Sequence, residues 1–315
     1  MVNESVVYAN NVFEQPWWLD IVAEGCWKEA IVKEDDDGEV IGRMPYVYKN
    51  KKIIMPAMTH TLGPWITPKY RSFQNGNKQL SKQKEIINNL ISQLPEYKSF
   101  NMYFDNSNEY ILPYRWLGFQ YRPTFSYRLD DLSDIDLLYS KVNKTVKKNV
   151  KSARNKTEIM TVESPEILLN LLDKTFEAQK RKTPGDRELK KKVISEAILR
   201  GNGKIFIAKD SKENIHSGAF LLFDSEVCYY LLGGSDPKFR SSGAQSLVLW
   251  EAIKFAAGSS RIFDFEGSNV ESIENFFRQF GGRRVINYNI VQQNLFDEFI
   301  EIIKPRIKRM IGYKI

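Results

Sequence analysis

The chain of 315 residues is 42% hydrophobic and 13% aromatic, and its formal net charge is +7. This length accommodates two ordinary domains, and the apolar content excludes a disordered chain because it suffices to fill packed cores. The positive charge favours an anionic partner, such as a nucleotide, RNA, an acidic glycan or a membrane surface, without choosing among them.

Cysteine and histidine are scarce, with two of each in the whole chain. With so few cysteines and histidines we expect no structural zinc site and no metal. Cys26 and Cys228 lie far apart in apolar, strand-like runs, and we interpret both as buried free thiols of a reducing compartment. Segment 1–11 lacks the features of a secretory signal, and no apolar run approaches the roughly 18 residues of a spanning helix. We therefore predict a cytoplasmic protein, with the inner face of the membrane as an alternative location.

The first half begins with a predicted helix over 14–23. Two strand-like runs, 27–33 and 40–48, follow and are joined by the turn residues Asp35 to Gly38. A short strand over 51–55 leads to a loop that contains Leu62, Gly63 and Pro64. Helical spacing over 80–94 and strands over 100–104 and 124–129 complete this half.

The second half repeats this order. We predict a strand over 158–162, helices over 165–182 and 188–200, a hairpin of 204–209 and 217–223, and a strand over 227–232. A nearly all-apolar helix over 243–257 follows, then a strand over 261–265, a short helix and a strand over 285–291.

Two similar segments suggest an internal duplication. The strand 100–105 leads to Gly118-Phe119, and the strand 261–266 leads to Gly281-Gly282. We predict an α/β protein with mixed sheets in two tandem domains, 1–130 and 131–292, followed by an amphipathic helix over 293–315. A chance similarity between two α/β halves is the alternative.

The segment 229–245 carries the most distinctive local pattern, a strand, a short loop and a buried helix. Unpaired N–H groups at a helix N-terminus suit a pyrophosphate, and small residues let the backbone approach it. The small residues are Ser241, Ser242, Gly243 and Ala244, and Lys238 and Arg240 add cationic contacts. A solvated turn capped by Ser241 or Ser242 is the simpler alternative.

Residues Arg240 to Gln245 resemble the phosphate loop of the GNAT acyltransferase superfamily, Gln/Arg-x-x-Gly-x-Gly/Ala, with Gln245 in place of the last small residue. More narrowly, Phe263 to Ser268 with Phe280-Gly281-Gly282, and Trp17-Trp18-Leu19 in the first half, resemble the Fem-type branch of tandem-GNAT transferases. This branch adds amino acids to peptidoglycan precursors or acylates cell-surface polysaccharide precursors.

The resemblance implies a donor site between two splayed strands, 227–232 and 261–265. Acyl-CoA, such as acetyl-CoA, would lie there and be attacked directly by an amine. Glu266 is our first expectation for the general base, Asp264 the second, and Tyr230 would donate a proton to the leaving thiolate. Alternatively, these acids have only a structural role, in which they bind backbone N–H groups. The donor residues would be Leu232, Gly233, Lys238, Arg240, Ser241, Ser242, Gly243, Ala244 and Gln245.

The acceptor is expected to contact both halves. In the first half Pro64 removes an N–H from the loop, so we expect no phosphate loop there and assign His60 and Trp65 to the acceptor cleft. In the second half Arg181 and Lys182 suit an anionic acceptor. Phe277 is the last acceptor residue, although its helical stripe is also typical of plain core.

Three hypotheses follow. The first is an acyl-CoA-dependent N-acyltransferase whose acceptor is a small-molecule, lipid-linked or nucleotide-linked glycan of the cell envelope. The second is a Fem-type transferase that uses aminoacyl-tRNA, which the basic stretch 141–156 favours. The third is a binding protein that kept the fold and lost turnover. The segment 295–311 is expected to pack on the first domain, with peripheral membrane contact as the alternative. We expect no DNA partner.

Overall fold

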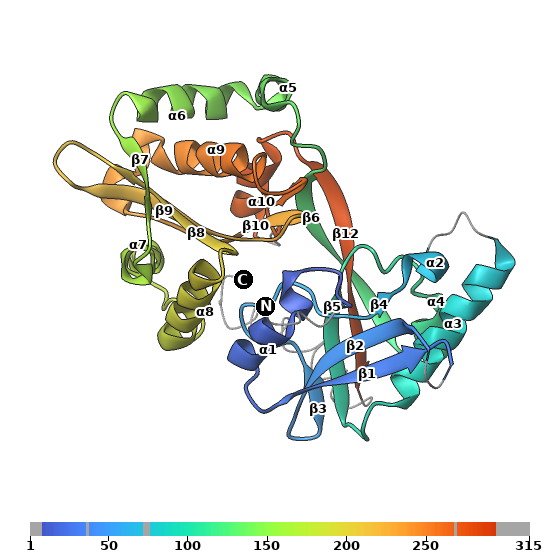
Figure 1. Cartoon of the computed structure of the whole chain (residues 1–315). Coiled ribbons are helices and arrows are strands. Elements are labelled where there is room, and N and C mark those ends of the chain that lie inside the picture. Colours follow the sequence, from blue (N-terminus) through green and yellow to red (C-terminus); the bar gives the residue numbers. More distant parts are fainter. Residues whose placement is uncertain (1–7, 36–37, 72–75, 268–269, 294–315) are drawn as a thin grey trace, which may run out of the picture. The chain divides into compact units, whose positions relative to one another are not determined.

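The computed structural model describes residues 8–35, 38–71, 76–267 and 270–293 (Figure 1). The chain divides into two compact units: unit 1 comprises Met1–Asn10, Ala23–Pro123 and Asn287–Ile315, and unit 2 comprises Asn11–Val22 and Thr124–Ile286. The predicted domains 1–130 and 131–292 stay a prediction, from which these units differ by placing 11–22 and 124–130 in unit 2 and 287–292 in unit 1. The predicted C-terminal helix lies outside the described residues except for Gln293.

Unit 1 is built on a mixed sheet. Strands β1 (Trp27–Lys33), β2 (Val40–Lys49) and β3 (Lys52–Ile54) pair antiparallel in sequence, β3 pairs parallel with β5 (Ser99–Phe104), and β5 pairs antiparallel with β12 (Arg283–Gln293). The two-residue strand β4 (Trp65–Ile66) pairs with β2. Helices α2 (Pro68–Arg71) and α4 (Leu112–Trp116) are short.

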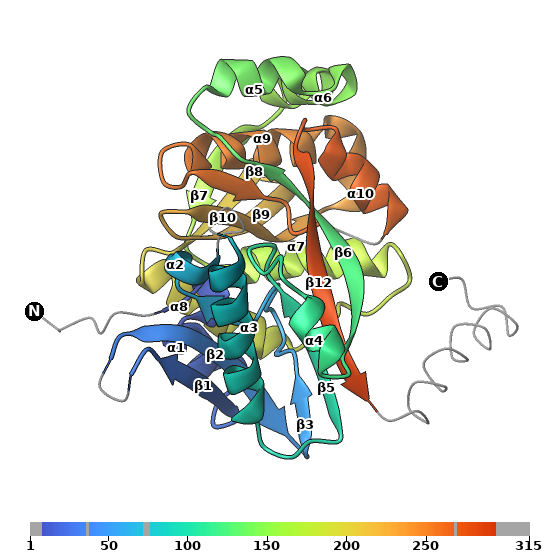
Figure 2. The ribbon, with the colours of Figure 1, turned by 90° about the vertical axis from the view of Figure 1, so that its right-hand side faces the viewer.

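Helix α3 (Asn77–Ser92) closes the core of unit 1. The helix packs against β1 and β2 (Figure 2). Its residues Ile86, Ile87 and Leu90 are buried. The approach is close at Gly42 of β2, where a Cβ atom would come within 2.5 Å of the side chain of Ile86. The helical spacing in the sequence thus corresponds to an amphipathic helix whose apolar face covers the sheet.

The strands of unit 2 belong to the same mixed sheet and lie between helices. Here the strand order is β12-β6-β11-β10-β9-β8-β7, in which β6 (Gln120–Leu129) pairs antiparallel with β11 (Ile262–Asp264) and β10 (Val227–Ser235) pairs parallel with β11. The hairpin of β8 (Gly203–Lys209) and β9 (Ile215–Phe223) joins β10 to β7 (Glu158–Val162).

Helices cover both faces of this sheet (Figure 1). On one face lie α9 (Ala244–Ala256) and, packed upon it, α6 (Lys144–Arg154); on the other lie α7 (Pro165–Glu177) and α8 (Arg187–Leu199). Unit 2 also contains η1 (Val12–Glu14), α1 (Pro16–Val22), α5 (Ile135–Lys141), η3 (Pro237–Ser242) and α10 (Glu271–Arg278).

The predicted elements are largely present, and the boundaries of several differ. The long helix predicted to residue 182 ends at Glu177, because Lys180 adopts a left-handed backbone with φ +55°. The basic stretch is two helices, because the side chain of Asn143 caps α6 by accepting a hydrogen bond from Thr145 N at 2.8 Å. Strand β10 continues beyond the predicted residue 232 to Ser235.

Two further sequence expectations concern membrane passage and cysteines. Within the described ranges, no helix is both long enough and apolar enough to cross a bilayer. Cys26 and Cys228 are both free thiols; Cys228 is buried, whereas Cys26 is half-buried.

Candidate functional site

The centre of unit 2 contains two parallel strands that separate. Strands β10 and β11 pair only from Val227 to Tyr229, opposite Ile262 to Asp264. Beyond Tyr229, β10 continues to Ser235 in pairing with β9, with an irregularity between Tyr230 and Leu232. Strand β11 has already ended, so the β10 edge that faced it presents backbone N–H and C=O groups without a partner strand in the described sheet. Such an edge can pair with an extended ligand.

The end of β10 leads into the predicted phosphate loop. The loop forms η3 and then α9, with Gly243 between them at φ +81°. A Cβ atom at Gly243 would lie 2.6 Å from the carbonyl oxygen of Asn149 on α6. Glycine is therefore needed here for the turn and for the contact between α6 and α9.

Burial divides the predicted donor residues of this loop into two groups. Lys238, Arg240 and Ser241 are exposed, so their side chains can reach an anion. Ser242 and Ala244 are buried, and the Ser242 hydroxyl accepts a hydrogen bond from the N–H of Ala244 at 3.2 Å. The N-cap residue of α9 is Gly243, which makes no side-chain cap bond, so Ser242 binds the first N–H of the helix from the residue before the cap. The cations beside it remain available.

Gln245, the residue that departs from the family pattern, ties the first turn of α9 to the sheet. Its amide oxygen accepts hydrogen bonds from the hydroxyl groups of Ser235, at 2.6 Å, and Ser217. Its amide nitrogen donates to the hydroxyl of Tyr230 at 2.7 Å. A small residue could make none of these bonds.

Tyr230 lies at the point where β10 and β11 separate. Its ring packs edge-on against Phe277 with 5.6 Å between centroids, and its hydroxyl lies over the backbone of Gly233. Burial raises the pKa of Tyr230 above its ordinary value, so the hydroxyl keeps its proton. Because the oxygen accepts from Gln245, the proton points elsewhere and can be donated.

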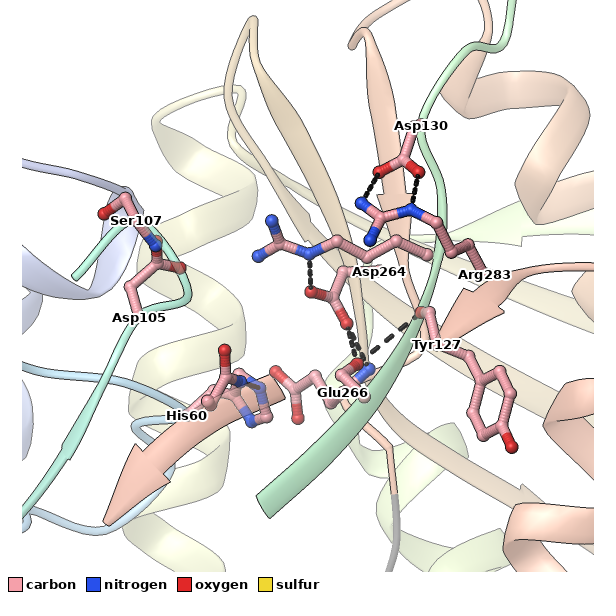
Figure 3. Close-up of polar contacts among 11 residues, drawn as sticks. His60, Asp105, Ser107, Tyr127, Asp130, Asp264, Glu266 and Arg283 are labelled. Atoms are coloured by element: carbon pink, nitrogen blue, oxygen red, sulfur yellow. Dashed lines mark hydrogen bonds and ion pairs between the residues drawn. The ribbon is translucent and has the colours of Figure 1, made fainter. Parts of the chain in front are cut away.

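Asp264, the last residue of β11, is fully buried in a network of three donors (Figure 3). One carboxylate oxygen accepts from Nε of Arg128 on β6 at 2.5 Å. The other accepts from the hydroxyl of Ser126 and from the backbone N–H of Glu266 at 2.7 Å. Both oxygens of Asp264 are therefore engaged within unit 2.

Glu266 differs from Asp264 in its backbone conformation and in its hydrogen bonding. The strand ends before it, so regular alternation does not orient its side chain, and its backbone is left-handed with φ +58°. Its Oε1 atom is buried and has no hydrogen-bond partner in the described structure. Burial, and then the charge of Asp264, raise the pKa of Glu266 well above its ordinary value.

The predicted acceptor residues fall in both units. In unit 1, His60 Nε2 lies 3.2 Å from Nδ2 of Asn287, and the Trp65 ring contacts Tyr8 with 4.9 Å between centroids. In unit 2, Phe277 is 5% exposed and packs against Phe265, which agrees with the plain-core alternative.

Arg181 and Lys182 line a pocket of about 330 Å³ beside α7 and α8. Lys190, which the sequence did not single out, also lines it, is 5% exposed, and donates to the carbonyl oxygen of Pro184. Burial lowers the pKa of Lys190. The remaining lining residues are Leu169, Asp173, Glu177, Thr183, Gly185 and Arg187.

The basic helix α6 has one apolar and one cationic face. Val146, Val150 and Ala153 are buried. Lys144, Lys148 and Lys151 are exposed. The apolar residues thus form a packing stripe, and the lysines form a solvated basic face. Among the described residues, no group of three or more His, Cys, Asp or Glu side chains could hold a metal ion.

Residues 140–278 match the family model "Acetyltransferase (GNAT) domain". The chain contains a GNAT domain. The matched residues begin in the last turn of α5 and include the separating strands, the loop and α9. The predicted resemblance is confirmed, and so is the prediction of an acyltransferase.

Solved structures extend the likeness in fold beyond the GNAT domain. The structure of FemX matches with a TM-score of 0.65 at 14% identity, over 89% of this chain and 92% of that chain. The C-terminal domain (DUF2156) of a putative lysylphosphatidylglycerol synthetase from Agrobacterium fabrum matches with a TM-score of 0.53 at 12% identity, over 89% of each chain. L-PGS from Bacillus licheniformis matches with a TM-score of 0.52 at 12% identity, over 94% of this chain and 91% of that chain.

These likenesses concern the fold, which is mixed α/β with two GNAT-like domains, as predicted. No curated protein matches the sequence.

Proposed function

We propose that the protein is an N-acyltransferase that moves an acyl group from acyl-CoA, such as acetyl-CoA, to an amine of a cell-envelope precursor or amino sugar. The single observation that carries this proposal is the separation of β10 from β11 after Tyr229, with Tyr230 on one strand and Glu266 just beyond the other. An extended donor placed there would have a hydroxyl donor and a carboxylate at its reacting end.

The donor would run along the free edge of β10 past Leu232 and Gly233. Its phosphates would meet the exposed side chains of Lys238 and Arg240 and the hydroxyl of Ser241. Ser242, Gly243 and Ala244 would supply the helix start, whose dipole favours a negative charge. Gln245 would hold that start against the sheet rather than touch phosphate, because its amide groups are already bonded to Ser217, Ser235 and Tyr230.

The chemistry would be a direct transfer in a ternary complex. The acceptor ammonium loses a proton to Glu266, and the resulting amine attacks the thioester carbon. A C–N bond forms, the nitrogen releases its second proton to solvent, and the C–S bond breaks. The thiolate takes the proton of the Tyr230 hydroxyl, which solvent then replaces. A raised pKa suits Glu266 to this role because a base works best when its pKa is near the operating pH. Asp264, our second expectation for the base, has both oxygens engaged.

The acceptor would be a small-molecule, lipid-linked or nucleotide-linked glycan. The pocket that Arg181 and Lys182 line supports an anionic group on it, because four cations and two acids surround the pocket, an excess of two positive charges. His60 and Trp65 remain our proposed acceptor contacts from unit 1, and Phe277 would act through the core. Work at the inner face of the membrane belongs to the same proposal, since a lipid-linked acceptor would be found there.

Aminoacyl-tRNA is the second candidate donor. The exposed lysines of α6 favour it, because a row of cations binds nucleic acid phosphates without regard to sequence. The likeness in fold to FemX and to the lysylphosphatidylglycerol synthetases is compatible with either donor.

Thermal stability with and without CoA, acetyl-CoA, charged tRNA and uncharged tRNA tests the proposal. A ligand at 100 times its dissociation constant stabilises by about 2.7 kcal/mol, which raises the melting temperature by several degrees. We expect acetyl-CoA to do so, and Lys238→Ala with Arg240→Ala to abolish the shift. Lys212→Ala, which removes an exposed cation from the turn between β8 and β9, is the matched control.

Stabilisation by charged tRNA alone, weakened by salt, would replace the first candidate by the second. A stabilising ligand with no turnover for any donor or acceptor would favour the third hypothesis, a binding protein that lost catalysis.

A further inference from the structure

The buried ion pair between Arg128 and Asp264 has no evident purpose in stabilising the fold. Strand β11 is three residues long, and only Phe263 and Asp264 pair with β6. Arg128 is 7% exposed and Asp264 is fully buried. Removing two charges from water opposes folding, and apolar residues at such positions are often as stabilising or more so. The contacts of the pair therefore indicate a local function rather than a contribution to stability.

The pair contacts the backbone of Glu266. The N–H of Glu266 donates to the Asp264 oxygen that also accepts from Ser126. Glu266 has φ +58°, a conformation that raises the energy of a residue with a side chain by about 1–2 kcal/mol. The hydrogen bond that this N–H donates to the Asp264 carboxylate offsets this strain.

The next residue restricts Glu266 from the other side. Gly267 has φ +66°, and a Cβ atom there would overlap the carbonyl oxygen of Phe125 on β6. The chain therefore passes directly over β6, which leaves Glu266 between an anchored strand end and a close backbone contact. Its orientation is fixed by neighbours on both sides in the sequence.

Other charged groups around this segment are bound elsewhere (Figure 3). The hydroxyl of Tyr127 donates to Glu274 at 2.5 Å, and its ring points away from Glu266. Arg283 makes two hydrogen bonds to Asp130, at 2.7 and 3.1 Å. Asp264 is thus the charge that acts on Glu266 within unit 2, and Arg128 is the bound partner of that charge.

We propose that Asp264, held by Arg128, is a positioning residue that fixes the strained backbone of Glu266 and leaves its carboxylate free to take the acceptor's proton. This inference rests on the proposed function, in which Glu266 is the base. It assigns the two acids of the strand end to different tasks: one touches the reacting amine, and the other acts through its neighbour.

The two partners act on Glu266 with opposite sign. Asp264→Asn removes a negative charge next to Glu266 and leaves the Arg128 cation, so the acidic limb of the kcat/KM profile moves to lower pH. Arg128→Gln leaves the Asp264 charge uncompensated, so the limb moves to higher pH. Each variant also loosens the base, and a misplacement of about 1 Å lowers the rate by about a hundredfold. Arg128→Lys, which keeps the charge, should recover part of the rate.

The measurement is the pH profile of kcat/KM for acetyl transfer, together with acetyl-CoA affinity by titration. Asp130→Asn, which breaks the exposed pair with Arg283, is the matched control and should leave the profile unchanged. We expect opposite shifts of the limb in Asp264→Asn and Arg128→Gln with acetyl-CoA affinity within about twofold of wild type, a negligible free-energy change.

Two results separate the failure of this inference from that of the proposed function. Full activity of Glu266→Gln would show that Glu266 is not the base. If Glu266→Gln loses activity but the pH profile of kcat/KM is unshifted in Asp264→Asn and Arg128→Gln, the positioning role alone is overturned. If Asp264→Asn does not fold, the comparison of Arg128→Lys with Arg128→Gln decides, since equal profiles there contradict the inference.

Discussion

The hydroxyl of Tyr230 lies directly over Gly233, where a Cβ atom would overlap it. The two residues belong to the same strand, on either side of the irregularity in its pairing with β9. This contact places the hydroxyl beside the free edge of β10 and explains the glycine at position 233. Gly234 has a different reason, because a Cβ atom there would lie 2.9 Å from the backbone of Leu171 on α7.

Gly233→Ala should therefore displace Tyr230. Because the ring is held by Phe277 and the hydroxyl by Gln245, we expect a loss of about 1–3 kcal/mol in the free energy of unfolding, typical of overpacking, and a large loss of acyl transfer. Urea denaturation and turnover measure the two effects. Gly258→Ala is the control, because its Cβ atom would meet its nearest neighbour at an ordinary 3.6 Å. Equal stabilities of the two variants would contradict the prediction.

Gln245→Ala should destabilise unit 2 without removing a phosphate contact. The change leaves the hydroxyls of Ser217, Ser235 and Tyr230 without their shared partner, and unsatisfied buried groups lower stability by about 1–3 kcal/mol. The melting temperature should fall, while the additional shift produced by acetyl-CoA should persist. Gln279→Ala, which removes an exposed hydrogen bond to Asn275, is the control. An unchanged melting temperature with a lost acetyl-CoA shift would instead make Gln245 a donor contact.

The architecture of unit 2 could be predicted largely from local patterns. The apolar run of α9 and the aromatic run of β10 are long, so their periodicity was decisive. The extension of β10 through Gly233 and Gly234 could not be predicted, because two glycines are typical of a turn and only the pairing with Ala219 and Gly218 keeps them extended. Tertiary contacts therefore decided the part of the strand that matters most for the donor.

The site was predictable in its residue types but not in its contacts. Asp264 and Glu266 were both apparent as acids at a strand end, whereas their separate surroundings depend on Arg128 and Ser126, which are 136 and 138 positions away from Asp264. The signal for Arg128 was present, since a charged residue next to Leu129 at the buried end of a strand is unusual. The roles of the proposed site residues stay predictions.

Glu266→Gln should change how stability depends on pH. The folded-state pKa of Glu266 is raised above its unfolded value, so folding favours the protonated acid. Its contribution is fully present below the unfolded value, near 4.5, and is lost as the pH rises through the folded pKa. Glutamine mimics the neutral acid at every pH, so the variant should gain stability relative to the wild type as the pH rises.

Melting temperatures of both proteins from pH 5 to pH 9 measure this difference. Glu271→Gln, an exposed acid at the start of α10, is the control and should run parallel to the wild type. A constant difference between Glu266→Gln and the wild type across this range would show that Glu266 is not held in its neutral form.

Arg181→Ala and Lys182→Ala should weaken acceptor binding and leave the donor site intact. Asp173 anchors the segment that carries both cations, since it accepts hydrogen bonds from Thr183 at 2.6 Å and from Arg187. The pocket should thus survive the loss of either side chain. A hydrogen bond to a charged group contributes about 1.5–3 kcal/mol, so each variant should raise the acceptor KM by about tenfold or more.

The measurement is the acceptor KM at saturating acetyl-CoA, with kcat and the acetyl-CoA dissociation constant as internal references and Lys212→Ala as the control. Interactions made equally in the ground and transition states change KM and leave kcat unchanged, which is the result we expect. A fall in kcat at constant KM would place these cations in the transfer step, and a weaker acetyl-CoA complex would assign the pocket to the donor. Either result would contradict an acceptor site beside α7 and α8.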